Sequence, residues 1–197
     1  MSMNFRKIFV LGTLAFVASV SVARAQFAVY GTVSAERMPV NSHCTPSTCA
    51  ETDGVAKPYG GTIGAYYDFR TYGPIRLGID IRGNFLNANK SATGFQGGTD
   101  LVRHYSGLGG LRAEFRTPFK VLRPYVQGSA GLGHTNAISG AYQNYTQVQG
   151  FAGLDLALFD NVDFRAIEVG AGELFGSSSH SIQTIGLGIV FHTSREK

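Results

Sequence analysis

The stretch Thr184-Ile-Gly-Leu-Gly-Ile-Val-Phe191 decides the fold class of this chain. Its side chains at Ile185, Leu187, Ile189 and Phe191 are apolar, whereas most of the positions between them are small or weakly polar. Because a strand directs alternate side chains to opposite faces, the stretch predicts a strand with one wholly apolar face. An apolar outer stripe beside an inner face of small residues is what a lipid-facing barrel strand requires.

The other end of the chain has the pattern of an export signal. Arg6 and Lys7 precede an apolar run over residues 8–22, and Ala23-Arg24-Ala25 then offers small residues at a cleavage site. The run is shorter than the ~20 residues with which a helix spans a bilayer, which favours a cleaved signal over a membrane anchor. We therefore expect residues 1–25 to be a secretory signal peptide cut after Ala25.

Composition and charge favour an all-β protein that does not bind nucleic acid. The chain has 26 glycines in 197 residues, well above the usual share of about 7%. Three of the 17 basic residues and none of the acidic ones lie in the expected signal, which leaves 14 basic against 13 acidic residues. This near-neutral balance gives no electrostatic case for a nucleic-acid partner.

Alternating hydrophobicity continues along the chain and predicts about eight strands. In the seventh of them, Arg165 and Glu168 can share a face only if a bulge lies between them. The expected strands cover residues 26–37, 60–70, 75–85, 102–116, 122–134, 145–159, 162–174 and 180–192.

Long and short connections alternate between these strands. Tight turns follow the second, fourth and sixth strands, as in Thr71-Tyr-Gly-Pro74. Alternation of this kind is typical of an up-and-down antiparallel barrel with long loops on one side of a membrane. The long or polar connections are expected at residues 38–58, 86–101, 135–144 and 175–179.

Charged side chains fall on the face opposite the apolar stripes, and their cost in lipid decides which face points inward. A charge against lipid at the midplane costs about 2–4 kcal/mol, so these residues are expected in the lumen. A barrel of eight strands is largely filled by its own side chains, which predicts an ion-pair network in place of an open pore. For Arg37 and Arg116, a lumen position and a solvated rim remain open. The expected network comprises Glu36, Arg70, Arg76, Asp80, Arg82, Arg112, Glu114, Asp155 and Arg165.

With these features the chain resembles the small bacterial outer-membrane β-barrel proteins, which include the OmpA-type transmembrane domain, the OmpX-like proteins and the opacity-type surface antigens. The order Thr184, Gly186, Ile189, Phe191 also resembles their C-terminal barrel-assembly signal, although here six residues follow Phe191. The resemblance implies a barrel over residues 26–192, a short tail over 193–197, and an outer-membrane location. Its expected partners are outer-membrane lipid and, during biogenesis, the barrel-assembly machinery.

The two cysteines, Cys44 and Cys49, lie in the first long connection. An even cysteine count in an exported protein favours a disulfide between them. Free thiols are one alternative, and a metal site with His43 is another, although its spacing matches no common zinc pattern and a fourth ligand is missing. We therefore expect no metal and no cofactor.

A catalytic reading rests on His180 and the serines beside it, Ser178, Ser179 and Ser181. Some outer-membrane barrels are lipid-modifying hydrolases, and Glu168 or Glu173 could supply the acid of such a site, but nothing in the sequence positions them. A solvated loop is the simpler explanation of this stretch. We expect a non-enzymatic barrel that acts as a structural or surface-interaction protein, presenting its loops to an extracellular ligand that the sequence does not identify. The alternatives are a narrow, porin-like passive channel for small solutes or ions and, as the weakest, a lipid-modifying enzyme.

Overall fold

The computed structural model describes residues 26–40, 54–89, 101–119, 121–138 and 142–193. The predicted signal peptide, Cys44, Cys49 and most of the predicted C-terminal tail lie outside these residues. Within them, no helix is long and apolar enough to cross a bilayer. The strands of the described residues are β1 (Gln26–Val40), β2 (Gly54–Ala56), β3 (Tyr59–Tyr72), β4 (Ile75–Asn89), β5 (Leu101–Phe115), β6 (Leu122–Thr135), β7 (Gln143–Ala157), β8 (Val162–Phe175) and β9 (Ser179–His192).

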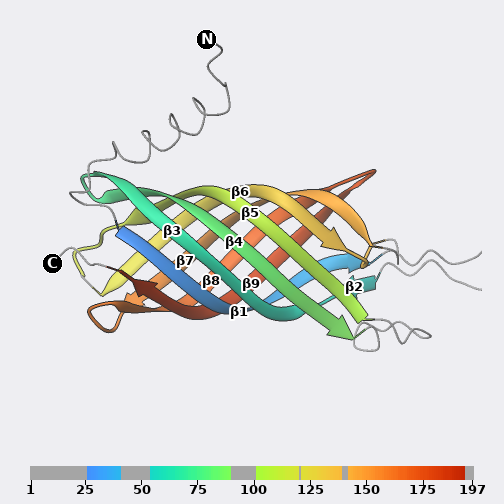
Figure 1. The fold of residues 1–197 in the computed structure, drawn as a ribbon, viewed down its shortest axis with the longest axis horizontal. Coiled ribbons are helices and arrows are strands. Elements are labelled where there is room, and N and C mark those ends of the chain that lie inside the picture. Colours follow the sequence, from blue (N-terminus) through green and yellow to red (C-terminus); the bar gives the residue numbers. More distant parts are fainter. Residues whose placement is uncertain (1–25, 41–53, 90–100, 120, 139–141, 194–197) are drawn as a thin grey trace, which may run out of the picture.

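Eight of these strands form a closed antiparallel barrel, as the sequence predicts (Figure 1). Strands adjacent in the barrel are also adjacent in the chain, and β1 closes it by pairing with β9 from Ala28–His192 to Arg37–Gln183. Closure pairs both edges of every long strand, so the wall has no free edge on which another chain could add. The fold is therefore an all-β, up-and-down barrel.

The first long connection departs from the prediction. Residues 38–58 were expected to be a loop, but β1 continues to Val40 and pairs there with the short β2. The partners run from Met38–Ala56 to Val40–Gly54. This hairpin extends the wall beyond the eight-strand register.

The two ends of the barrel differ in their connections. At the turn end, β3 passes to β4 through Gly73, whose φ of 55° lies in the left-handed region that favours glycine. At the opposite, long-loop end, β1 finishes at Val40 and β4 at Asn89. Strand β1 begins and β9 ends together at the turn end (Figure 1).

Two bulges adjust the register of the wall. One lies between Arg165 and Glu168 in β8, where the sequence leaves the register open, and because of it both side chains point into the lumen. The other lies between Asp68 and Arg70 in β3. It turns Arg70 to the outer face, where it pairs with Leu77.

The outer face carries a continuous apolar belt. Large apolar side chains are exposed on every long strand, for example Val33 at 67%, Leu111 at 68% and Leu187 at 52%. The long strands have 14 or 15 residues, whereas about 9–11 tilted residues are enough to cross a bilayer. Each strand is therefore long enough to extend beyond a bilayer at one end.

Candidate functional site

The lumen near the turn end is filled by a chain of alternating charges. The Arg112 guanidinium lies 3.1 Å from Glu114 and 3.2 Å from Asp155. Arg165 lies 2.9 Å from the other oxygen of Asp155 and 3.1 Å from Glu168. The described residues of this charged network are Arg76, Arg82, Arg112, Arg165, Asp68, Asp80, Glu114, Asp155 and Glu168.

Arg82 ends this chain nearer the middle of the barrel. It donates to Glu168 at 2.9 Å, to Asp80 at 3.2 Å and to the side-chain oxygen of Gln127 at 2.9 Å. Its guanidinium also lies 3.9 Å from the centre of the Phe151 ring. A buried guanidinium is tolerated when its donors are used in this way, because charge-assisted hydrogen bonds offset its desolvation.

Tyrosines separate the arginines and complete their surroundings. Arg112 lies 4.0 Å from the ring centre of Tyr66 and 4.4 Å from that of Tyr125. Arg165 lies 4.4 Å from the ring centre of Tyr30. Such cation–π contacts are strongest where water is excluded, as it is here. Rings and ion pairs together fill the cross-section of the barrel.

A layer of short polar side chains follows toward the long-loop end. Thr62 donates to Asn84 at 2.7 Å, and Asn84 donates to Ser106 at 2.7 Å. The hydroxyls of Ser34 and Thr62 lie 3.1 Å apart, which continues the layer onto β1. Hydrogen bonds between these neutral groups replace the ion pairs of the charged network.

The long-loop end of the lumen is apolar instead of charged. A cluster of buried side chains fills it, among which Val102, Leu174 and Ile182 have no exposed surface. We call this cluster the apolar cap. Its members are Met38, Ala56, Ala88, Val102, Ala137, Ile138, Tyr145, Leu174 and Ile182.

The outer face changes in the opposite sense at the same level. On β9 the exposed positions are Ser181 and Gln183 at the long-loop end, followed by Ile185 and Leu187. On β4 the exposed position beside the apolar cap is Asn87, which follows the exposed Phe85. The turn end thus has polar contents and an apolar wall. The long-loop end has the apolar cap inside and a wall in which polar side chains outnumber the exposed aromatic ones, such as Tyr59 and Phe175.

The structure places most of the predicted lumen residues together, with two differences. Arg70 is exposed on the outer wall, 4.7 Å from the centre of the Tyr72 ring, because of the bulge that follows Asp68. Asp68 takes the inner position and lies 3.7 Å from Arg76. Glu36 is buried apart from the charged network, beneath the apolar cap, with its carboxylate 3.8 Å from His104.

Several lumen residues have no counterpart in the sequence analysis. Four of them could have been identified, because strand alternation puts each one opposite the apolar stripe of its own strand: Tyr30, Tyr66, Tyr125 and Gln127. Glu168 is not in the predicted network, although a bulge beside Arg165 would bring it there. The sequence does not predict the apolar cap if the same face of each strand is taken to be apolar along its whole length. The pair Arg37 and Met38, where the outward residue becomes polar and the inward one apolar, carries the signal.

Of the residues considered for catalysis, His180 contacts one of the neighbouring serines. The Ser178 hydroxyl lies 2.8 Å from a ring nitrogen of His180. Glu173 accepts a hydrogen bond from Ser179 at 2.9 Å. Among the described residues no carboxylate is hydrogen-bonded to His180, so the third member of a triad is not in place. In the described part of the chain, no three acidic, histidine or cysteine side chains are grouped to hold a metal.

The predicted assembly-signal residues lie on β9. Ile189 and Phe191 are exposed on the apolar belt, whereas Thr184 and Gly186 face inward. Gly186 packs against Ser34, whose hydroxyl would lie 2.8 Å from an added β-carbon. A larger residue would collide with β1 at the seam that closes the barrel.

No model of a known protein family and no curated protein matches the sequence. The fold is similar to the crystal structure of Neisserial surface protein A, with 16% identity, a TM-score of 0.56, and coverage of 84% of this chain and 96% of that chain. It is also similar to Ail, the attachment invasion locus protein of Yersinia pestis, solved with the heparin analogue sucrose octasulfate. That match has 15% identity and a TM-score of 0.51, and covers 86% of this chain and 99% of that one. The chain therefore has the fold of the small eight-stranded outer-membrane β-barrels.

Proposed function

We propose that this chain is a closed outer-membrane barrel without enzymatic activity, which holds a rigid rim and its loops outside the membrane. The observation that carries the proposal is the reversal of polarity along the strands. The apolar belt with its charged contents suits lipid, whereas the polar wall around the apolar cap suits water. The strands are also longer than a bilayer requires.

The proposed location follows from the same features and from the predicted export signal. In this orientation the turn end faces the periplasm and the long-loop end faces outward. The barrel-assembly machinery would recognise β9 through Thr184, Gly186, Ile189 and Phe191. Exposed rim residues and the loops they carry would then contact an extracellular ligand or neighbouring surface components.

The filled lumen argues against the alternative of a narrow passive channel. The charged network and the apolar cap occupy the barrel in series, so an ion would have to displace paired charges and then cross an apolar constriction. We expect no stable conductance steps when the protein is inserted into a planar bilayer. Migration of the unheated protein as a compact, faster band on a denaturing gel would show that the sample is folded. Reproducible steps from such folded protein would favour the channel.

The lipid-modifying alternative has one observation in its favour, the contact between Ser178 and His180. Lipid profiles of cells with the native chain and with His180→Ala test it. We expect identical profiles, because no described carboxylate is hydrogen-bonded to His180 to orient its ring. A lipid product lost only in the His180→Ala strain would instead indicate an enzyme.

A further inference from the structure

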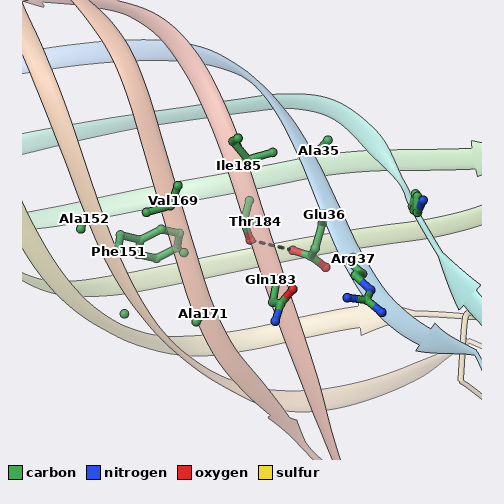
Figure 2. Close-up of a pocket in the computed structure, with 13 residues that line it drawn as sticks. Ala35, Glu36, Arg37, Phe151, Ala152, Val169, Ala171, Gln183, Thr184 and Ile185 are labelled. Carbon is green, nitrogen blue, oxygen red and sulfur yellow. Dashed lines mark hydrogen bonds between the residues drawn. The ribbon is translucent and has the colours of Figure 1, made fainter.

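The outer wall has a groove that the lumen does not explain. It has a volume of about 750 Å³ and crosses β7, β8, β9 and β1 (Figure 2). Exposed wall residues line it, whereas Glu36 points into the lumen, where Thr184 donates to it at 3.5 Å. Figure 2 shows Ala152 and Arg37 toward opposite ends of the lining. We call this feature the wall groove.

Small residues in register across the strands account for its shape. One row of cross-strand partners consists of Ala152, Val169, Ile185 and Ala35. The next row toward the long-loop end consists of Gly150, Ala171, Gln183 and Arg37. The exposed positions nearer the turn end are bulkier, as in the pair Leu187 and Val33. Glycine and alanine therefore leave a depression where the surrounding belt is filled.

Positive charge marks the end of the wall groove that lies toward the rim. Arg37 and Lys57 line it, and both side chains are exposed. Among the described residues, no ion pair engages either one. A smaller hollow of about 280 Å³ adjoins it, sharing Arg37 and Gln183 and including Ser181. Glu173, the exposed acid farther along β8, is hydrogen-bonded to Ser179.

The wall groove lies where the outer face changes from apolar to polar. Ile185 belongs to the apolar belt, and the next exposed residue on β9, Gln183, begins the polar rim. A lipid headgroup would occupy this level, and its acyl chains would extend from it toward the turn end. The groove thus presents cations at headgroup depth and an apolar depression at acyl depth.

We propose that the wall groove binds one phosphate-bearing lipid of the outer leaflet. The acyl part lies over Gly150, Ala152 and Ala171, and the phosphate lies against Arg37 and Lys57, with the Gln183 amide as a further donor. Cationic side chains near a membrane surface contribute about 1 kcal/mol each toward anionic lipid, and apolar burial adds to this. The inference rests on the proposed outer-membrane location.

Native mass spectrometry of the detergent-solubilised protein tests the proposal, with diphosphorylated lipid A and its dephosphorylated form as probes. We expect the native chain to retain one molecule of the diphosphorylated lipid. The double variant Arg37→Gln/Lys57→Gln should weaken retention about thirtyfold, from the loss of two charge contacts. Gly150→Leu should weaken it as well, because its side chain fills the groove.

The chain offers matched controls for both variants. A β-carbon at Gly150 would meet only the carbonyl oxygens of Ala171 and Gln127 at 3.9 Å, so a side chain can leave the backbone there without a close contact. Gly107→Leu adds the same side chain at another exposed glycine, on β5, with nothing within 4 Å. Arg103→Gln is the control for the charge variant, because it removes an exposed cation near the long-loop end of β5, away from the wall groove. Both controls should retain the lipid as the native chain does.

Three results would overturn the proposal: no retained lipid, equal retention by the groove variants, or equal retention of dephosphorylated lipid A. A separate measurement reports on the membrane location. If the native chain shows the heat-dependent band shift and inserts into vesicles but retains no lipid, only the groove proposal fails. If it is soluble without detergent, the proposed function fails too.

Discussion

The two ends of this barrel differ in which face of the wall carries the polar side chains. At the turn end, Arg112 and Arg165 are buried inside while Leu111 and Leu187 are exposed outside. At the long-loop end, Leu174 is buried inside while Asn87 is exposed outside. One continuous sheet therefore behaves as a membrane protein over part of its length and as a water-soluble barrel over the rest. The membrane boundary can therefore be located from two properties of a strand: its length, and the position at which the polar side chains change from one face to the other.

The largest effect is expected from breaking the charged network. Arg165→Ala removes the arginine that bridges Asp155 and Glu168. Each carboxylate then keeps one arginine, Arg112 or Arg82, and the buried network has one positive charge fewer. Removing one member of a buried ion pair typically costs about 3–5 kcal/mol. Urea unfolding of the protein in lipid vesicles, followed by far-ultraviolet circular dichroism because the chain has no tryptophan, measures this loss.

The matched control is Arg70→Ala, which removes an exposed arginine from the outer wall. Its contact with the Tyr72 ring is its principal described interaction, so the expected cost is below about 1 kcal/mol. Equal costs for Arg165→Ala and Arg70→Ala would show that the charged network does not stabilise the barrel.

The apolar cap should respond as an ordinary protein core. Leu174 is fully buried, and Leu174→Ala should lower the free energy of unfolding by about 2–5 kcal/mol, through lost burial and the cavity left behind. The same urea titration measures it. Asn87→Ala, on the outer face of the same end, should stay within about 0.5 kcal/mol. A neutral Leu174→Ala would mean that the cap is not packed.

Charges introduced at two positions on the outer face of β9 test where the apolar belt ends. Leu187→Arg places a cation in the apolar belt and should cost about 2–4 kcal/mol. Gln183→Arg adds the same side chain on the same face, nearer the rim, where the cost falls to about 0–1 kcal/mol. Folding titrations of the two variants give the difference directly. If both substitutions cost the same, the boundary does not lie between these positions.

The smallest effect is expected in the neutral layer between the two ends. Thr62→Val removes a hydroxyl that bonds Asn84 and lies 3.1 Å from the Ser34 hydroxyl. The expected loss is about 1 kcal/mol, or somewhat more if Asn84 is left unsatisfied. Thr146→Val, at an exposed position of β7, is the control and should be near neutral. A loss above that of Leu174→Ala would contradict the proposed ranking.

Much of the fold could be predicted from the sequence, because period-two alternation fixes which residues share a face. It identified the barrel, most of the strands and most of the charged network, but it left the register around Arg165 and Glu168 open. The prediction that Arg70 points into the lumen was wrong, because no feature of the neighbouring sequence indicates the bulge after Asp68.

The remaining differences have a different physical origin. The wall groove depends on the register across four strands, including the pairing of Gln183 on β9 with Arg37 on β1 at the other end of the chain, which no single stretch encodes. The apolar cap was within reach of the sequence. The inward positions of β1 change from the polar Glu36 to the apolar Met38 within two residues. This change can be interpreted only if the strand is assumed to continue beyond the membrane.

The central claim is that the outer wall changes from apolar to polar at the membrane boundary. Measuring the membrane depth of positions along the outer face of β9 tests it most directly. Single cysteines at positions 181, 183, 187 and 189, in a background with Cys44→Ser and Cys49→Ser, would carry spin labels in vesicle-inserted protein. We predict that labels at 187 and 189 are relaxed by oxygen dissolved in lipid. Labels at 181 and 183 should be relaxed by a water-soluble nickel chelate. Labels that are all equally accessible to the chelate would contradict a wall whose polarity reverses at the membrane boundary.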